Sequence, residues 1–108
     1  MGRNEEAVNY FEQAIRIQTD FAPTHYNLGC VYMRLKKFKK AINPIEQVVR
    51  LQPQNAEARL LLGQPYLLGN DKQSAQNQYK NLAALNPPLA QKLYSAIYAN
   101  LLVTVAEK

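Results

Sequence analysis

The stretch Asn27-Leu28-Gly29-Cys30-Val31-Tyr32 organises this sequence, because it returns 34 residues later as Leu61-Leu62-Gly63-Gln64-Pro65-Tyr66. Both copies contain a Leu-Gly pair and a Tyr three residues after the Gly. Further small, bulky and proline positions follow the same offset: Ala7, Ala41 and Ala75; Phe11, Ile45 and Tyr79; Ala14, Val48 and Leu82; and Pro53 and Pro87. So much agreement at one fixed offset indicates an internal repeat.

This pattern resembles the tetratricopeptide repeat (TPR) family, whose signature combines these residue types at a period of about 34 residues. The resemblance covers roughly residues 5–89. It implies an all-α helix-turn-helix solenoid of about six antiparallel helices in a right-handed superhelical stack. A Gly inside a helix costs about 1 kcal/mol relative to Ala, so the repeated Gly predicts close approach of a second helix. The signature is lost after residue 89, where Ala96-Ile97 replaces Leu-Gly and Asn100 replaces the Tyr.

We expect a single domain over residues 1–108 with four parts. These are the second helix of a truncated repeat (4–18), two repeats (22–55 and 56–89) and a terminal helix (90–108). Asn4 and Asn55 are predicted N-caps. Pro44 and Pro65 lie inside predicted helices, where each removes one backbone hydrogen bond. We expect tolerated kinks, with irregular geometry near Gln64–Tyr66; a bend that reshapes a binding groove is the alternative.

Composition and motifs offer little support for catalysis. The net charge is +5, and one cysteine excludes an internal disulfide framework. His25 is the single histidine and is predicted to be a packing residue, and Cys30 a small apolar side chain. Ser74 and Ser95 belong to no nucleophile motif, and no glycine-rich phosphate loop is present. We therefore expect no enzymatic activity, no catalytic residue, no metal site and no cofactor.

The TPR resemblance implies that the first helix of each pair lines a concave groove that binds a protein or peptide. Helical spacing then selects these groove residues: Tyr26, Asn27, Cys30, Met33, Leu60, Gln64, Leu67, Tyr94 and Tyr98. Packing against neighbouring repeats is the alternative role for them. Some TPR proteins clamp a C-terminal carboxylate, but here only Asn27 matches, and Glu57 and Leu61 replace basic residues. We predict a peptide with apolar anchors, bound with micromolar affinity and weak salt dependence.

Two further surfaces are candidates for contacts. One is the basic turn formed by Arg34, Lys36, Lys37, Lys39 and Lys40, either a solvated turn or a docking site for an acidic segment or a phosphate. Nucleic acid is not expected, because Phe38 is the one interleaved aromatic residue. Membrane binding is not expected either, since no apolar run approaches the length of about 20 residues that spans a bilayer.

The second surface is the terminal helix, which has two apolar stripes where one suffices for docking. Leu93, Ile97 and Leu101 form the first stripe; the second contains Tyr94, Tyr98, Leu102 and Val105. We predict a homodimer or an exchanged helix with Leu102 and Val105 in the contact, because a large exposed apolar patch is unfavourable. The leading function is thus a protein-interaction module that acts as an adaptor or scaffold. The alternatives are a structural oligomerisation module and a helper domain of a larger enzyme.

Overall fold

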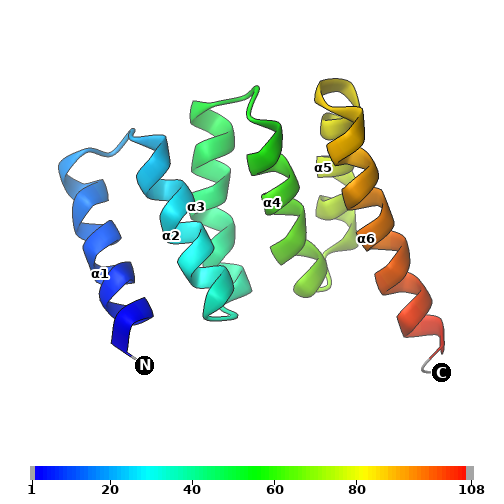
Figure 1. The fold of residues 1–108 in the computed structure, drawn as a ribbon, viewed down its shortest axis with the longest axis horizontal. Helices are drawn as coiled ribbons and strands as arrows, with labels where there is room; N and C mark the ends of the chain where they lie inside the picture. The colour runs from blue at the N-terminus through cyan, green and yellow to red at the C-terminus, as the bar shows by residue number, and fades with distance from the viewer. Residues whose placement is uncertain (1, 107–108) are drawn as a thin grey trace.

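The computed structural model describes the backbone of residues 2–106 and the side chains of residues 2–99. This range contains no β-strand and six helices: α1 (Gly2–Ile17), α2 (Ala22–Arg34), α3 (Phe38–Leu51), α4 (Ala56–Leu68), α5 (Lys72–Leu85) and α6 (Pro87–Ala106). Short links make neighbouring helices antiparallel, and they stack along the longest dimension, which measures 45 Å (Figure 1). The all-α helix-turn-helix solenoid predicted from the sequence is confirmed.

The helices are arranged in two rows. In the view of Figure 1, α2, α4 and α6 lie in front, and α3 and α5 lie behind them. Each rear helix packs against the front helices before and after it, so α3 contacts α2 and α4, and α5 contacts α4 and α6. In the front row, α4 also packs directly on α6. Helix α1 packs on α2, the first helix of that row. This arrangement leaves the front helices with one face that no rear helix covers.

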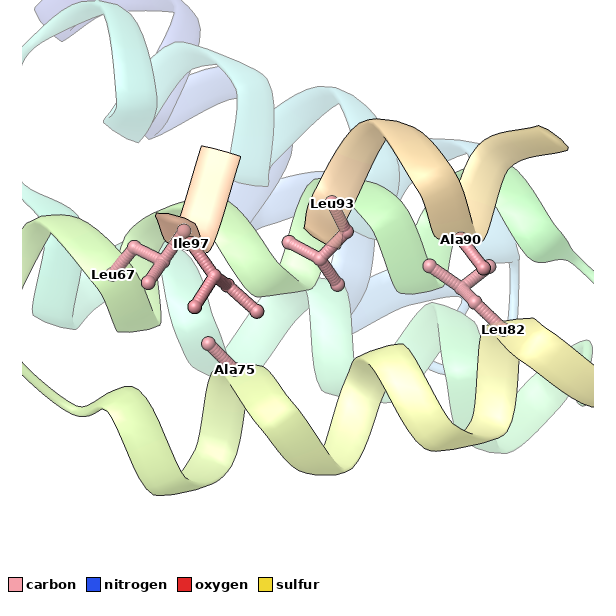
Figure 2. Close-up of a cluster of buried hydrophobic side chains, with 6 residues drawn as sticks. All are labelled: Leu67, Ala75, Leu82, Ala90, Leu93 and Ile97. Carbon is pink, nitrogen blue, oxygen red and sulfur yellow. The ribbon is translucent and has the colours of Figure 1, made fainter. Parts of the chain in front are cut away.

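The core consists of two clusters of buried side chains that meet at α4. The first lies between α2, α3 and α4 and contains Leu28, Tyr32, Ala41, Ile45 and Leu62. The second lies between α4, α5 and α6 and contains Leu67, Ala75, Leu82, Ala90, Leu93 and Ile97 (Figure 2). The repeated alanines of both clusters are 0% exposed. The predicted close approach at the repeated Gly is also found, since a Cβ on Gly29 would lie 2.6 Å from Ile45 Cγ1.

The helix ends follow local chemistry, with two departures from the sequence analysis. The predicted cap at Asn55 is confirmed, because its Oδ1 accepts a hydrogen bond from the Ala58 amide at 3.0 Å. The predicted cap at Asn4 is wrong, because α1 already begins at Gly2 and Asn4 lies inside its first turn. The terminal helix begins at Pro87, earlier than predicted, because proline needs no amide partner in a first turn.

The two internal prolines leave their helices continuous. α3 and α4 are each one uninterrupted α-helix through Pro44 and Pro65, so neither proline ends its helix; the irregular geometry expected near Gln64–Tyr66 stays a prediction. Both proline rings are buried, and Pro65 is among the most completely buried side chains. Tertiary packing around the two rings therefore holds the helical course despite the missing backbone donors.

Candidate functional site

Most of the predicted groove residues belong to α2 and α4. We define the α2–α4 face by Tyr26, Asn27, Cys30 and Met33 of α2 and Glu57, Leu60 and Gln64 of α4, and its role as one binding groove stays a prediction. Tyr26, Cys30, Met33 and Leu60 are half-buried, whereas Asn27, Glu57 and Gln64 are exposed. Both helices rest on α3, which forms the floor between them (Figure 1).

Electrostatics show that side chains from both helices meet on this face. Burial raises the pKa of Tyr26 above its ordinary value of 10.0, and the nearby Cys30 and Glu57 raise it further. Burial also raises the pKa of the Cys30 thiol, which Arg34 partly opposes. The thiol is therefore protonated at neutral pH, and the role predicted for Cys30 as a small apolar side chain stays a prediction.

A pocket opens at one end of the α2–α4 face. It has a volume of about 240 Å³ and lies where the start of α2, the end of α3 and the cap of α4 converge. Its walls are Ala22, Pro23, Tyr26, Asn27, Val48, Gln52 and Asn55. The pocket thus joins two predicted groove residues, Tyr26 and Asn27, to a rear-helix residue, Val48, that the sequence identified only as a core position.

Three predicted groove residues lie elsewhere. Leu67 is wrongly placed in the groove: it is only 8% exposed and packs in the cluster beneath α6, beside Ile97 (Figure 2). Tyr94 and Tyr98 are exposed, but they face α5 rather than the α2–α4 face. The physical reason is the rotation of α6, which directs Leu93 and Ile97 into the core and turns the tyrosine stripe outward.

Tyr94 and Tyr98 belong to a second pocket, between α5 and α6, which we call the tyrosine pocket. Its volume is about 300 Å³, and its walls are Lys72, Gln76, Tyr79, Lys80, Tyr94, Ile97 and Tyr98. The ring centroids of Tyr79 and Tyr94 are 5.4 Å apart, and those of Tyr94 and Tyr98 are 4.4 Å apart. The sequence analysis did not identify Lys72, Gln76 or Lys80, because no repeat position marks them.

The basic turn lies between α2 and α3, where the sequence analysis placed it. Lys36, Lys37, Lys39 and Lys40 line an open pocket of about 420 Å³ together with Phe38 and Gly69. Lys36 has a left-handed backbone with φ 58°, and the Lys36 and Lys37 amides donate to the carbonyls of Met33 and Tyr32. Arg34 lies on the last turn of α2 and does not line this pocket. A docking role for the turn stays a prediction.

The remaining predictions concern His25, a metal site and the oligomer contact. His25 is buried, and its Nε2 donates to the Thr19 carbonyl at 2.7 Å, which confirms its role in packing. The described residues contain no group of three His, Cys, Asp or Glu side chains placed to hold a metal ion. The predicted oligomer contacts Leu102 and Val105 lie outside the residues whose side chains the structure describes, so that contact stays a prediction.

Within the described range, no helix combines the length and the apolar character that crossing a bilayer requires.

Known proteins with similar sequences or structures share the helical-repeat pattern. A family model described as "Tetratricopeptide repeat" matches residues 22–55, and one described as "TPR repeat" matches residues 1–36. The protein O-mannosyl-transferase Tmtc3 of Drosophila melanogaster is 49% identical over 37 residues, which are 34% of this chain and 4% of that protein. The chain therefore spans a small fraction of this curated relative.

Two solved structures share the fold across nearly the whole chain. The first TPR of Spaghetti (RPAP3), bound to the HSP90 peptide SRMEEVD, has a TM-score of 0.80 and 22% identity over 93% of this chain and 81% of that one. The MamA RS-1 ArsTM double mutant has a TM-score of 0.73 and 19% identity over 95% and 68%. At these identities the likeness shows the fold.

Proposed function

Because the chain belongs to the tetratricopeptide repeat family, we propose that it is a protein-interaction module and that the α2–α4 face is its binding surface. The proposed occupant is an extended or helical peptide segment with apolar anchor side chains. It lies across α2 and α4 and inserts one anchor beside Tyr26. The module acts as an adaptor or scaffold, because binding through such a face brings two polypeptides together without altering either covalently.

The observation that carries this proposal is the position of Tyr26. Its ring is half-buried on α2, is close enough to Glu57 of α4 for that carboxylate to raise its pKa, and also forms a wall of the adjoining pocket. A large, rigid aromatic side chain in this position offers a wide contact area, and it loses little conformational entropy when a peptide binds. Met33 and Leu60 supply further adaptable apolar surface, and burial of such surface contributes about 25 cal/mol per Å².

Charge on the face favours a peptide without an acidic tail. Glu57 is exposed near Tyr26, whereas the one nearby cation, Arg34, lies at the edge of the face. The similar Spaghetti structure holds the acidic peptide SRMEEVD. In this chain, a carboxylate near Tyr26 would meet the negative charge of Glu57, which raises the cost of binding. We therefore propose neutral, apolar anchors rather than an acidic carboxyl terminus.

The test is a fluorescence-polarisation titration with two dye-labelled peptides at low and at high salt. One peptide is uncharged and carries spaced Leu and Phe residues, and the other is SRMEEVD. We expect the neutral peptide to bind with micromolar affinity and with little change on adding salt, because screening acts on charges. SRMEEVD is expected to lose affinity when salt is added, because screening removes any attraction between its carboxylates and the net positive chain.

Matched variants locate the site. Tyr26→Ala and Met33→Ala should each weaken binding of the neutral peptide several-fold, whereas Tyr10→Ala, at a 70%-exposed tyrosine on α1, should not. Circular dichroism checks that every variant is folded. Binding that is unaffected by Tyr26→Ala contradicts the proposal. Strong weakening by salt, together with loss of binding in Lys39→Glu, would move the site to the basic turn.

A further inference from the structure

The tyrosine pocket has a chemistry distinct from that of the α2–α4 face. We propose that it is a second binding site, which accepts a peptide segment with one large apolar side chain between two carboxylates. The apolar side chain inserts among Tyr79, Tyr94 and Tyr98, and the carboxylates contact Lys72 and Lys80. This inference does not depend on the function proposed for the α2–α4 face, because the two sites share no residue.

The first argument is exposed aromatic surface. Tyr94 is 38% exposed and Tyr98 is 47% exposed, although both rings lie against a pocket whose inner wall is the buried Ile97. The two rings are tilted by 48° rather than stacked in parallel, so they form a concave wall instead of a flat surface. Such a wall fits a single bulky side chain, and covering it removes apolar area from water.

The second argument is charge. α5 and α6 contain Lys72, Lys80 and Lys92 and no Asp or Glu over their entire lengths. Asp71, which directly precedes α5, caps that helix and accepts hydrogen bonds from the Ser74 amide at 3.1 Å and from its hydroxyl at 2.7 Å; Glu107, which directly follows α6, lies outside the described residues. Among the described side chains, neither pocket lysine forms an ion pair. Both lysines therefore remain available to an incoming anion.

The spacing of the lysines sets the spacing of the carboxylates. Lys72 and Lys80 are eight residues apart on α5, which corresponds to about 12 Å along a helix. In an extended peptide, the residues two before and two after an anchor are about 13 Å apart and point to the anchor's side. A Glu-x-Phe-x-Glu segment thus places its ring in the pocket and one carboxylate near each lysine.

Tyrosines beside lysines are also found where proteins bind single-stranded nucleic acid, but this pocket fits a peptide better. A nucleic-acid strand needs a continuous track of phosphate contacts and flat faces for successive bases. Here two lysines flank one concavity, and the adjacent tyrosines are tilted against each other. The site therefore matches one anchor with two charges rather than a repeating polyanion.

The experiment uses the full chain and a capped, dye-labelled peptide, Gly-Glu-Ser-Phe-Ser-Glu-Gly, followed by fluorescence polarisation. Control peptides replace Phe with Ser or both Glu residues with Lys. We expect the parent peptide to bind and both control peptides to bind at least about tenfold more weakly. Added salt should weaken binding of the parent peptide, because two of its contacts are ionic.

Variants assign the binding to the pocket. Tyr98→Ala, at an exposed position, should weaken binding about tenfold with the far-ultraviolet spectrum unchanged. Lys80→Glu should have a similar effect, and a peptide with Lys in place of the second Glu should recover part of the loss. Lys39→Glu, in the basic turn, makes the same charge change outside the pocket and serves as the matched control. Tyr26→Ala, which tests the α2–α4 face, should leave this affinity unchanged.

Three outcomes overturn the inference. Equal losses in Lys39→Glu and Lys80→Glu would mean that only net charge attracts the peptide. Displacement of the peptide by a short single-stranded oligonucleotide at lower concentration would assign the pocket to nucleic acid. Sedimentation that shows self-association of the chain, abolished by Tyr98→Ala, would mean that a second copy fills the pocket. The inference is supported if Tyr26→Ala still binds the parent peptide and Tyr98→Ala does not. This result is independent of whether the α2–α4 face binds a peptide.

Discussion

Gly29 and Gly63 occupy equivalent positions in the two repeats, but different helices press against them. A Cβ on Gly29 would lie 2.6 Å from Ile45 Cγ1, near the backbone of the rear helix of the same repeat. A Cβ on Gly63 would instead lie 2.7 Å from Leu93 Cδ1, the end of a longer side chain on α6. Both neighbours are fully buried, but Ile45 has less freedom to move, because it is branched at Cβ close to its own backbone, whereas Leu93 meets Gly63 with the end of its side chain.

We predict that Gly29→Ala destabilises the chain more than Gly63→Ala does. Replacing glycine with alanine stabilises the helix by up to about 1 kcal/mol through helix propensity, whereas overpacking destabilises the fold by about 1–3 kcal/mol. The balance should be a net loss of roughly 1–2 kcal/mol for Gly29→Ala and a change near zero for Gly63→Ala, where Leu93 can adjust. Urea denaturation measures both values. A Gly63→Ala variant that loses more stability than Gly29→Ala would contradict this account.

At the scale of single helices, α2 and α4 end in the same way, 34 residues apart. Each helix is followed by a residue with a left-handed backbone, Lys36 with φ 58° and Asn70 with φ 66°. The next amide then reaches back five residues, from Lys37 to the Tyr32 carbonyl and from Asp71 to the Tyr66 carbonyl. This is the Schellman motif, in which glycine is favoured at the left-handed position because it has no Cβ.

Lys36→Gly is therefore predicted to stabilise the chain. A left-handed backbone costs an ordinary residue roughly 1–2 kcal/mol, of which glycine should recover about 0.5–1 kcal/mol after its own greater entropy loss. Lys36→Ala is the matched control, because it removes the same charge but keeps a Cβ at the left-handed position. Thermal unfolding should show a higher midpoint for Lys36→Gly and no rise for Lys36→Ala. Equal shifts in the two variants would show that charge removal, not backbone strain, is responsible.

Across the whole molecule, a tyrosine of each repeat contacts a glutamate of the helix that precedes it. Tyr66 donates to Glu46 Oε2 at 2.7 Å, and Tyr32 donates to Glu12 Oε2 at 3.5 Å. Both pairs obey the 34-residue offset, so the repeat also encodes how successive repeats are joined. Burial and then the bond to Glu46 raise the pKa of Tyr66 well above its ordinary value of 10.0.

This contact predicts an alkaline loss of stability. The folded chain holds the Tyr66 proton more tightly than the unfolded chain, so the stabilisation is complete below about pH 10 and is lost as the pH rises above it. Tyr66→Phe should cost about 1 kcal/mol at neutral pH and flatten the decline above about pH 10. Denaturation at several pH values measures both effects. Tyr32→Phe should lower the free energy of unfolding by less, because the bond from Tyr32 to Glu12 is longer. If the stability of the wild type and that of Tyr66→Phe fall in parallel above about pH 10, the assignment to Tyr66 is refuted.

The 34-residue period by itself determined the helices and most of the core. A helical repeat places many equivalent residues in similar environments, so the buried Ala41 and Ala75 and the capping Asn55 could be read from spacing and local chemistry. One feature misled that interpretation: Asn4 suggested a cap, but α1 already begins at Gly2.

The rotation of α6 was decided only by the tertiary structure. The sequence of this helix offers two adjacent apolar stripes, and helical periodicity contains no rule for which one is buried. Packing against α4 and α5 selects Leu93 and Ile97, because Leu93 fits against the bare backbone at Gly63. That choice covers Leu67 and turns Tyr94 and Tyr98 toward Tyr79. The tyrosine pocket therefore depends on contacts between residues far apart in the chain, which local sequence patterns do not encode.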